Sequence, residues 1–187
     1  MRSLKTTVLR ITVGANVHHV AKKERPMSQD PAQAPHWKHD GVCVVPGNQL
    51  DTNTAQTPGM NRAAAINFAR VGAQKLWAGT VHIHANAKTG AHHHGPLESV
   101  IYVLKGRARM RWGDALEFTA EAGPGDFIYV PPFVPHQEIN ASATEVLECV
   151  LVRSDGEAVA VNLDIAPVEP PETVLWVDAS AKTGGRQ

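Results

Sequence analysis

Three adjacent histidines open the stretch HHHGPLE, residues 92–98. Residues two apart on an extended strand point to the same face, so His92 and His94 can bind one ion while the histidine between them points away. Glu98 lies an even number of positions further on, although the intervening Gly-Pro turn makes strict alternation unreliable there. That turn can instead swing the Glu98 carboxylate back toward the imidazoles. The stretch therefore indicates a metal site carried by a strand.

A second segment, GDFIYVPPFVPH at residues 125–136, supplies another histidine further along the chain. Its closely spaced prolines fix the backbone torsions and position His136 at low entropic cost. Three imidazoles and one carboxylate suit one divalent transition metal such as Mn, Fe, Co, Ni, Cu or Zn, of which we favour Fe or Mn. An octahedral ion with four protein ligands would keep about two positions open for water, O2 or a substrate. The expected ligands are His92, His94, Glu98 and His136.

The sequence around these segments is typical of an all-β domain. From Leu76 onward, short β-rich runs alternate with turn signals at intervals of about 8–12 residues, as in sandwiches and barrels. Gly113-Asp114 is a good two-residue hairpin turn between two such runs. The predicted runs are Leu76–Ala85, Val100–Leu104, Arg107–Trp112, Phe127–Val130, Val146–Val152 and Ala158–Leu163. Residues 61–75 are ambiguous, because Ala63-Ala64-Ala65 favours a helix whereas Gly72 interrupts it.

The chain divides by composition into three parts: an N-terminal leader at residues 1–41, one β domain at 42–165 and a tail at 166–187. The leader is rich in basic residues and poor in acids over its first part, which fits an organelle transit peptide; alternatively, the true chain begins at Met27. We expect the leader to be poorly ordered. The tail begins proline-rich and holds one short β-like run, Val174–Val177.

The two histidine segments resemble the paired motifs of the cupin superfamily. His92, His94 and Glu98 match the ligands of the first motif, although Gly106 follows Glu98 after seven residues rather than six. In the second motif four positions fall in register, namely Gly125, Pro131, His136 and Asn140. Two motifs in the right order, with all the ligand positions filled, make the resemblance specific.

The resemblance covers residues 76–152 and implies a single cupin domain, an all-β double-stranded β-helix or jelly-roll barrel. Asn86 and Phe133 stand where the family has glycine, which affects turns rather than ligands. Such proteins commonly dimerise through an N-terminal strand, for which Val42–Val45 is the candidate, so we expect a homodimer. The metal would lie inside the barrel on His92, His94, Glu98 and His136.

Three further residues are candidates for the substrate pocket: Tyr102, Arg109 and Phe133. Tyr102 and Phe133 either line the cavity or pack beside it. Arg109 belongs to an alternating strand of arginines that anchors an anionic substrate if it faces inward. If it faces outward, it is a solvated surface residue, which is the usual place for arginine. Glu98, if it loosens from the metal, can also act as a base.

The composition limits the partners and the compartment. Lys+Arg and Asp+Glu are both 18, giving a formal net charge of +0, which disfavours nucleic-acid binding driven by phosphate neutralisation. No apolar run approaches the roughly 18–20 residues needed to cross a membrane. The 2 cysteines cannot form a disulfide framework and suggest a reducing compartment. We therefore expect a cytoplasmic protein that binds a small molecule and neither nucleic acid nor a membrane.

The expected function is that of a metal-dependent oxygenase or related oxidoreductase acting on a small organic substrate. One alternative is an O2-independent isomerase, epimerase or lyase acting on a sugar or sugar acid, with the metal as a Lewis acid. Another is a non-catalytic barrel that binds a small molecule. Cupins host many chemistries, so the fold alone does not choose among these three.

Overall fold

The structure is a computed structural model that describes residues 38, 41–155 and 160–176. The chain divides into the units Met1–Val42 and Cys43–Gln187, and every strand found in the described ranges lies in the second unit. Among its described residues, helix is confined to the 3-10 turn η2 (Gly47–Gln49) and to α2 (Phe68–Val71). The prediction of an all-β domain is therefore confirmed.

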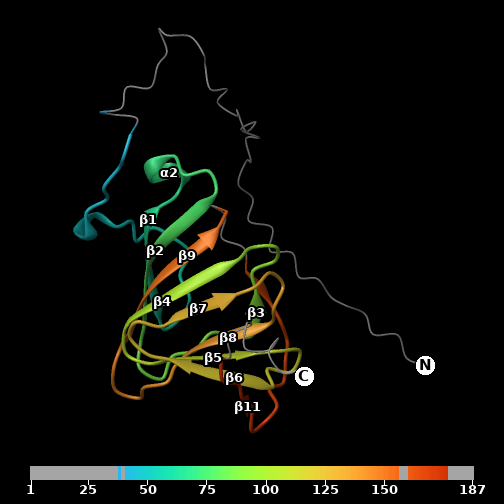
Figure 1. The fold of residues 1–187 in the computed structure, drawn as a ribbon. Helices are drawn as coiled ribbons and strands as arrows, with labels where there is room; N and C mark the ends of the chain where they lie inside the picture. The colour runs from blue at the N-terminus through green and yellow to red at the C-terminus, as the bar shows by residue number, and fades with distance from the viewer. Residues whose placement is uncertain (1–37, 39–40, 156–159, 177–187) are drawn as a thin grey trace, which may run out of the picture. The chain divides into compact units, whose positions relative to one another are not determined.

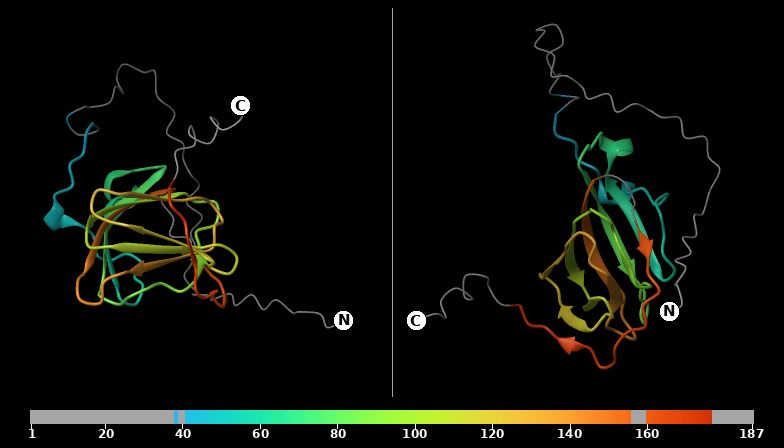
Figure 2. Two further views of the ribbon diagram at one scale, coloured as in Figure 1. Left: turned by 60° about the horizontal axis from the view of Figure 1, so that its bottom comes forward. Right: turned by 90° about the vertical axis from the view of Figure 1, so that its right-hand side faces the viewer.

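The strands form two sheets that pack face to face (Figure 1). The first sheet has the order β1-β2-β9-β4-β7, and the second has the order β10-β3-β8-β5-β6-β11. This arrangement is the double-stranded β-helix that the sequence predicted, and Figure 2 shows its two layers from the side. The strands are β1 (Met60–Ile66), β2 (Leu76–Ile83), β3 (His92–His93), β4 (Ser99–Lys105), β5 (Ala108–Trp112), β6 (Phe118–Ala122), β7 (Phe127–Val130), β8 (His136–Asn140), β9 (Leu147–Ser154), β10 (Val161–Asn162) and β11 (Glu172–Thr173).

The core lies between the two sheets and follows from strict alternation along their strands. In β9, Leu147, Cys149 and Leu151 are buried while the residues between them are only half-buried. Antiparallel pairing brings Cys149 opposite Val81 of β2 and Val103 of β4, both of which are buried. Because residues paired across neighbouring strands share a face, this register aligns the inward side chains of the first sheet in rows.

Gly79 shows how closely β1 and β2 pair. A Cβ atom added at Gly79 would lie 2.2 Å from the carbonyl oxygen of Ala63 on β1. No real side chain tolerates that distance, so only glycine fits at this point of β2. The absence of a side chain at Gly79 thus allows β1 to pair closely with β2.

The ambiguous segment at residues 61–75 contains both kinds of structure. It begins in β1, which pairs with β2, and then forms the single turn of α2. The Asn67 side chain caps that turn by accepting a hydrogen bond from the Arg70 backbone N–H, and Gly72 ends it in the left-handed conformation. Pairing with β2 thus overrides the helical preference of the alanines, and the glycine limits the helix to one turn.

The ends of the chain differ from the sequence-based expectations where they are described. The tail contributes β11, which pairs in parallel with β6, whereas Val174–Trp176 of the expected run form no strand. Residues 1–37 and 39–40 of the expected leader lie outside the described residues. The Val42–Val45 segment forms no strand within the chain, and Val42 is 97% exposed. Dimerisation through it stays a prediction. Over the described ranges, no helix has the length and apolar character required to cross a membrane.

Candidate metal centre

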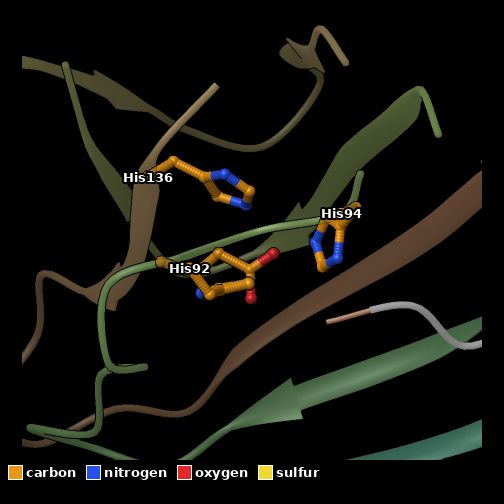
Figure 3. A group of neighbouring side chains, drawn as sticks. His92, His94 and His136 are labelled. Carbon is orange, nitrogen blue, oxygen red and sulfur yellow. The ribbon is translucent and has the colours of Figure 1, made fainter. Parts of the chain in front are cut away.

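His92, His94 and His136 meet inside the barrel. His92 lies on β3 and pairs in register with His136 on β8, and His94 follows directly after β3. The centroid of the His92 ring lies 4.4 Å from that of His136 and 4.8 Å from that of His94, and all three residues are buried. Figure 3 shows the rings gathered around one space. The fold thus brings together the three imidazoles that the two sequence segments predicted.

Backbone hydrogen bonds orient two of the imidazoles. His92 Nδ1 lies 2.9 Å from the carbonyl oxygen of Gly90, and His136 Nδ1 lies 2.8 Å from that of Val134. Because a carbonyl oxygen only accepts, each Nδ1 carries the proton and donates it. Each Nε2 therefore keeps its lone pair, which is the arrangement that metal-binding histidines adopt.

The Nε2 atom of His136 is the most telling atom in the cluster. It is buried and has no hydrogen-bond partner among the described residues. A buried polar atom left in this state costs about 1–3 kcal/mol, so its persistence calls for a ligand. Burial also lowers the pKa of His136, which keeps the ring in the neutral form that binds a cation. The atom thus fits a divalent metal.

Glu138 supplies the carboxylate of the cluster. One ligand atom from each of His92, His94, His136 and Glu138 lies within 4.8 Å of the others. Glu138 is only 7% exposed, and burial by itself would raise its pKa. Electrostatic interaction with the neighbouring histidines and with Arg62 outweighs burial, and the pKa of Glu138 is lowered. The carboxyl group is thus ionised and ready to bind a cation.

Glu98 lies outside this cluster, in contrast to the expectation from its motif. Its side chain is exposed and accepts a 2.6 Å hydrogen bond from the Tyr129 hydroxyl, which raises the pKa of Tyr129. The inward position is taken by Ser99, which is 2% exposed and pairs with Arg153 of β9. The extra residue between Glu98 and Gly106 accounts for this exchange, because a shift of one residue moves a side chain to the opposite face of a strand.

The sequence contained a signal for Glu138 that the motif resemblance does not include. Glu138 is two residues beyond His136 on the same strand, so the two side chains must share a face. The same parity rule that joined His92 and His94 applies here without an intervening turn. Position on β8 therefore predicts the fourth ligand more safely than spacing across the Gly-Pro turn.

None of the three predicted pocket residues lines the cavity beside His92 and His94. Tyr102 alternates with the buried Ile101 and Val103 of β4. Its ring packs against that of Phe127, with 4.6 Å between the two ring centroids. Phe133 is 62% exposed. Arg109 points outward, because the alternate residues Ala108 and Met110 are buried. Its guanidinium forms an ion pair with Glu121. The outward alternative is the one observed for Arg109, whereas Arg111 of the same strand is buried and forms an ion pair with Glu169.

Two other arginines face the cluster from the first sheet. Arg153 Nη2 lies 3.2 Å from His94 Nε2, and Arg153 Nε lies 3.3 Å from Ser99 Oγ. Arg62 of β1 pairs in register with the buried Val81, which turns its side chain toward the interior. A cavity of about 200 Å³ adjoins both arginines, His92 and His94. Neither arginine stands out in the sequence, because each is alone on its strand.

Comparison with known proteins identifies the fold. Residues 79–153 match the family model described as the cupin domain. A polyketide cyclase from Streptomyces resistomycificus is 24% identical with a TM-score of 0.54, over 70% of this chain and 89% of the cyclase. A Klebsiella pneumoniae protein with a double-stranded β-helix domain is 15% identical with a TM-score of 0.51, over 66% of this chain and 98% of its own.

A further similar structure is the oxalate decarboxylase of Bacillus subtilis, which is 23% identical with a TM-score of 0.51. The match covers 60% of this chain but only 30% of the decarboxylase. No curated protein sequence matches the chain. At these identities the solved structures show the fold alone.

Proposed function

The chain belongs to the cupin superfamily, and from this premise we propose that it is a metal-dependent enzyme that carries out oxygenase or related oxidoreductase chemistry on a small organic substrate. The observation that carries the proposal is the unpartnered, buried Nε2 of His136 within a cluster of three histidines and one glutamate. A cation bound there would satisfy this atom and balance the charge of Glu138.

The proposed ligands are the three imidazoles and the Glu138 carboxylate. This mixed nitrogen and oxygen set suits Fe(II) or Mn(II), and related sets with open positions serve non-haem iron oxygenases. An ion held there would supply a redox-active, Lewis-acidic centre for a substrate and O2. The backbone bonds at His92 Nδ1 and His136 Nδ1 hold both rings in place before any ligand arrives. Glu138 lowers the net positive charge of the filled site.

The cavity beside His92 and His94 provides the route by which a small molecule reaches the cluster. Its volume of about 200 Å³ lies below the roughly 300–1,000 Å³ of sites for drug-sized ligands, which favours a small substrate. Trp77 and Leu151 give the cavity an apolar wall, and Thr57 adds a polar group. This mixture fits an organic molecule better than a bare inorganic ion.

Metal analysis of protein purified without an affinity tag tests the first half of the proposal. We expect about one divalent metal ion per chain, and we expect the double variant His92→Ala, His136→Ala to lose it while its circular dichroism shows a folded β domain. A wild-type protein that holds no metal after reconstitution with Fe(II), Mn(II) and the other candidate ions would contradict the metal site.

Oxygen consumption tests the second half. The Fe(II) form, reconstituted without air, is mixed with O2 and a panel of small phenols, diketones, thiols and organic acids. Uptake of O2 that depends on one substrate class supports oxygenase chemistry. Turnover that proceeds equally without O2 would reassign the reaction to isomerase or lyase chemistry, and a fully loaded protein that is silent across the panel counts against catalysis.

A further inference from the structure

Arg62 and Arg153 come from different strands of the first sheet and face the same cavity. Arg62 lies on β1 and Arg153 on β9, and β2 runs between these two strands. Both side chains line the cavity together with His92 and His94. Their positive charges are close enough for Arg62 to lower the pKa of Arg153, on which burial has the larger effect. Two like charges thus share one small space beside the candidate metal centre.

Neither arginine has a carboxylate partner at ion-pair distance among the described residues. Arg62 Nη1 donates to the Thr57 hydroxyl at 2.7 Å, and Arg153 contacts the Ser99 and His94 side chains. Arginines at the barrel exterior are paired differently: Arg109, for example, has Glu121. A half-buried guanidinium is normally paired with an acid, so this cavity lacks the anion that its charges call for.

Glu138 is the acid whose charge acts on both arginines. Its single negative charge cannot neutralise two guanidinium groups, and a bound cation would offset that charge further. Glu138 does not line the cavity, and the described lining residues include no aspartate or glutamate. The space beside the arginines therefore keeps a positive potential with or without a metal.

We propose that this cavity binds the carboxylate of a small organic acid, with Arg62 and Arg153 as the anion-binding groups. The planar fork of a guanidinium matches a carboxylate in two parallel hydrogen bonds. The apolar wall formed by Trp77 and Leu151 accommodates the carbon skeleton. The role of this acid as substrate rests on the proposed function, whereas its binding to the arginines does not.

Isothermal titration calorimetry tests the proposal with acetate, pyruvate and succinate, and with succinamide as the uncharged control. The protein is titrated once after metal removal with an uncharged phenanthroline chelator, which does not compete for the arginines, and once after loading with Mn(II). We expect at least one of the acids to bind in both forms and succinamide to bind in neither. Equal binding of succinate and succinamide, or no binding of any acid, would overturn the proposal.

Variants then assign the binding to the arginines. Arg62→Gln and Arg153→Gln should each weaken binding of the acid about tenfold or more, because each loses charge-assisted hydrogen bonds. Arg153→Lys should fall between Arg153→Gln and the wild type, since it keeps the charge and loses the fork. Arg109→Gln is the matched control, because it removes an outward arginine, and its affinity should equal that of the wild type.

Failure of the carboxylate site and failure of the proposed function give different results in these experiments. Metal content and melting temperature are measured on every variant, and the metal-free titrations separate the arginines from the cluster. If Arg62→Gln and Arg153→Gln bind the acid as well as Arg109→Gln does, the carboxylate site is refuted while the metal centre stands. If the wild type binds no metal but keeps arginine-dependent acid binding, the proposed function fails and the carboxylate site stands. Tighter binding of inorganic phosphate than of every acid would overturn the choice of a carboxylate.

Discussion

The position of the fourth metal ligand can be tested by exchanging one atom in each of two glutamates. Glu138→Gln keeps the shape of a buried side chain within the cluster and removes its negative charge. Glu98→Gln makes the same chemical change at an exposed side chain that bonds to Tyr129. The structure predicts that only the first change weakens metal binding, whereas the motif resemblance predicts that the second does.

The expected magnitude follows from linkage between binding and folding. A metal present at 100 times its dissociation constant stabilises the folded state by about 2.7 kcal/mol. For a domain of this size, about 1 kcal/mol corresponds to roughly 3–5 °C in the melting temperature, so the wild type should gain roughly 8–14 °C. Loss of one ligand weakens the affinity by about 100-fold or more, since loss of even an outer-sphere partner costs 10- to 100-fold. At the same metal concentration, Glu138→Gln should gain only about 1–2 °C.

Differential scanning fluorimetry with and without Mn(II) or Fe(II) measures these shifts, and equilibrium dialysis supplies the affinities directly. Glu98→Gln should melt and bind metal as the wild type does. If Glu98→Gln loses the metal-dependent shift while Glu138→Gln keeps it, the cluster of three histidines and Glu138 is not the binding site, and the register of β4 at this point is incorrect.

Three further outcomes follow from individual residues. Gly79→Ala should destabilise the domain by about 2–3 kcal/mol in urea unfolding, because its Cβ would meet a carbonyl oxygen of β1 at 2.2 Å, and an unchanged midpoint would contradict the pairing. Cys149 is buried, and its pKa is raised to about 12, so Ellman's reagent at pH 8 should modify the exposed Cys43 and leave Cys149 unreacted until denaturant is added. The Tyr129 hydroxyl has a raised pKa because it donates a hydrogen bond to Glu98. Ultraviolet titration of Glu98→Gln should therefore show this tyrosine ionising at lower pH than in the wild type, and an unchanged titration would mean that the bond is absent.

Much of the fold could be predicted from local patterns in the sequence. Alternation of apolar residues marks strands such as β9, and the turn signal at Gly113-Asp114 marks the hairpin of β5 and β6, although their connection runs from Gly113 to Glu117 rather than over two residues. The histidines at 92 and 94 were predictable because one parity rule of extended backbone applies to both. The pairing of β3 with β8 then required long-range information, which the resemblance to a family supplied.

The sequence-based predictions were wrong where local patterns do not determine the direction in which a side chain points. Parity fails across a turn, which is why Glu98 was predicted as a ligand and Ser99 holds the inward position instead. A lone arginine on a strand gives no sign of its direction until its partners are known, so Arg62 and Arg153 were not predicted. In contrast, Arg109 of the conspicuous arginine row points outward to Glu121.

The candidate site is divided between the two layers of the barrel. The cation-binding side chains come from β3, the residue after it and β8 of one sheet, and the guanidinium groups come from β1 and β9 of the other. Under the proposed function, the groups for catalysis and the groups for substrate selection come from different sheets. Arg62 on β1 is therefore the residue at which a protein engineer can alter the choice of small molecule with the least effect on the cluster, because Arg153 also contacts His94.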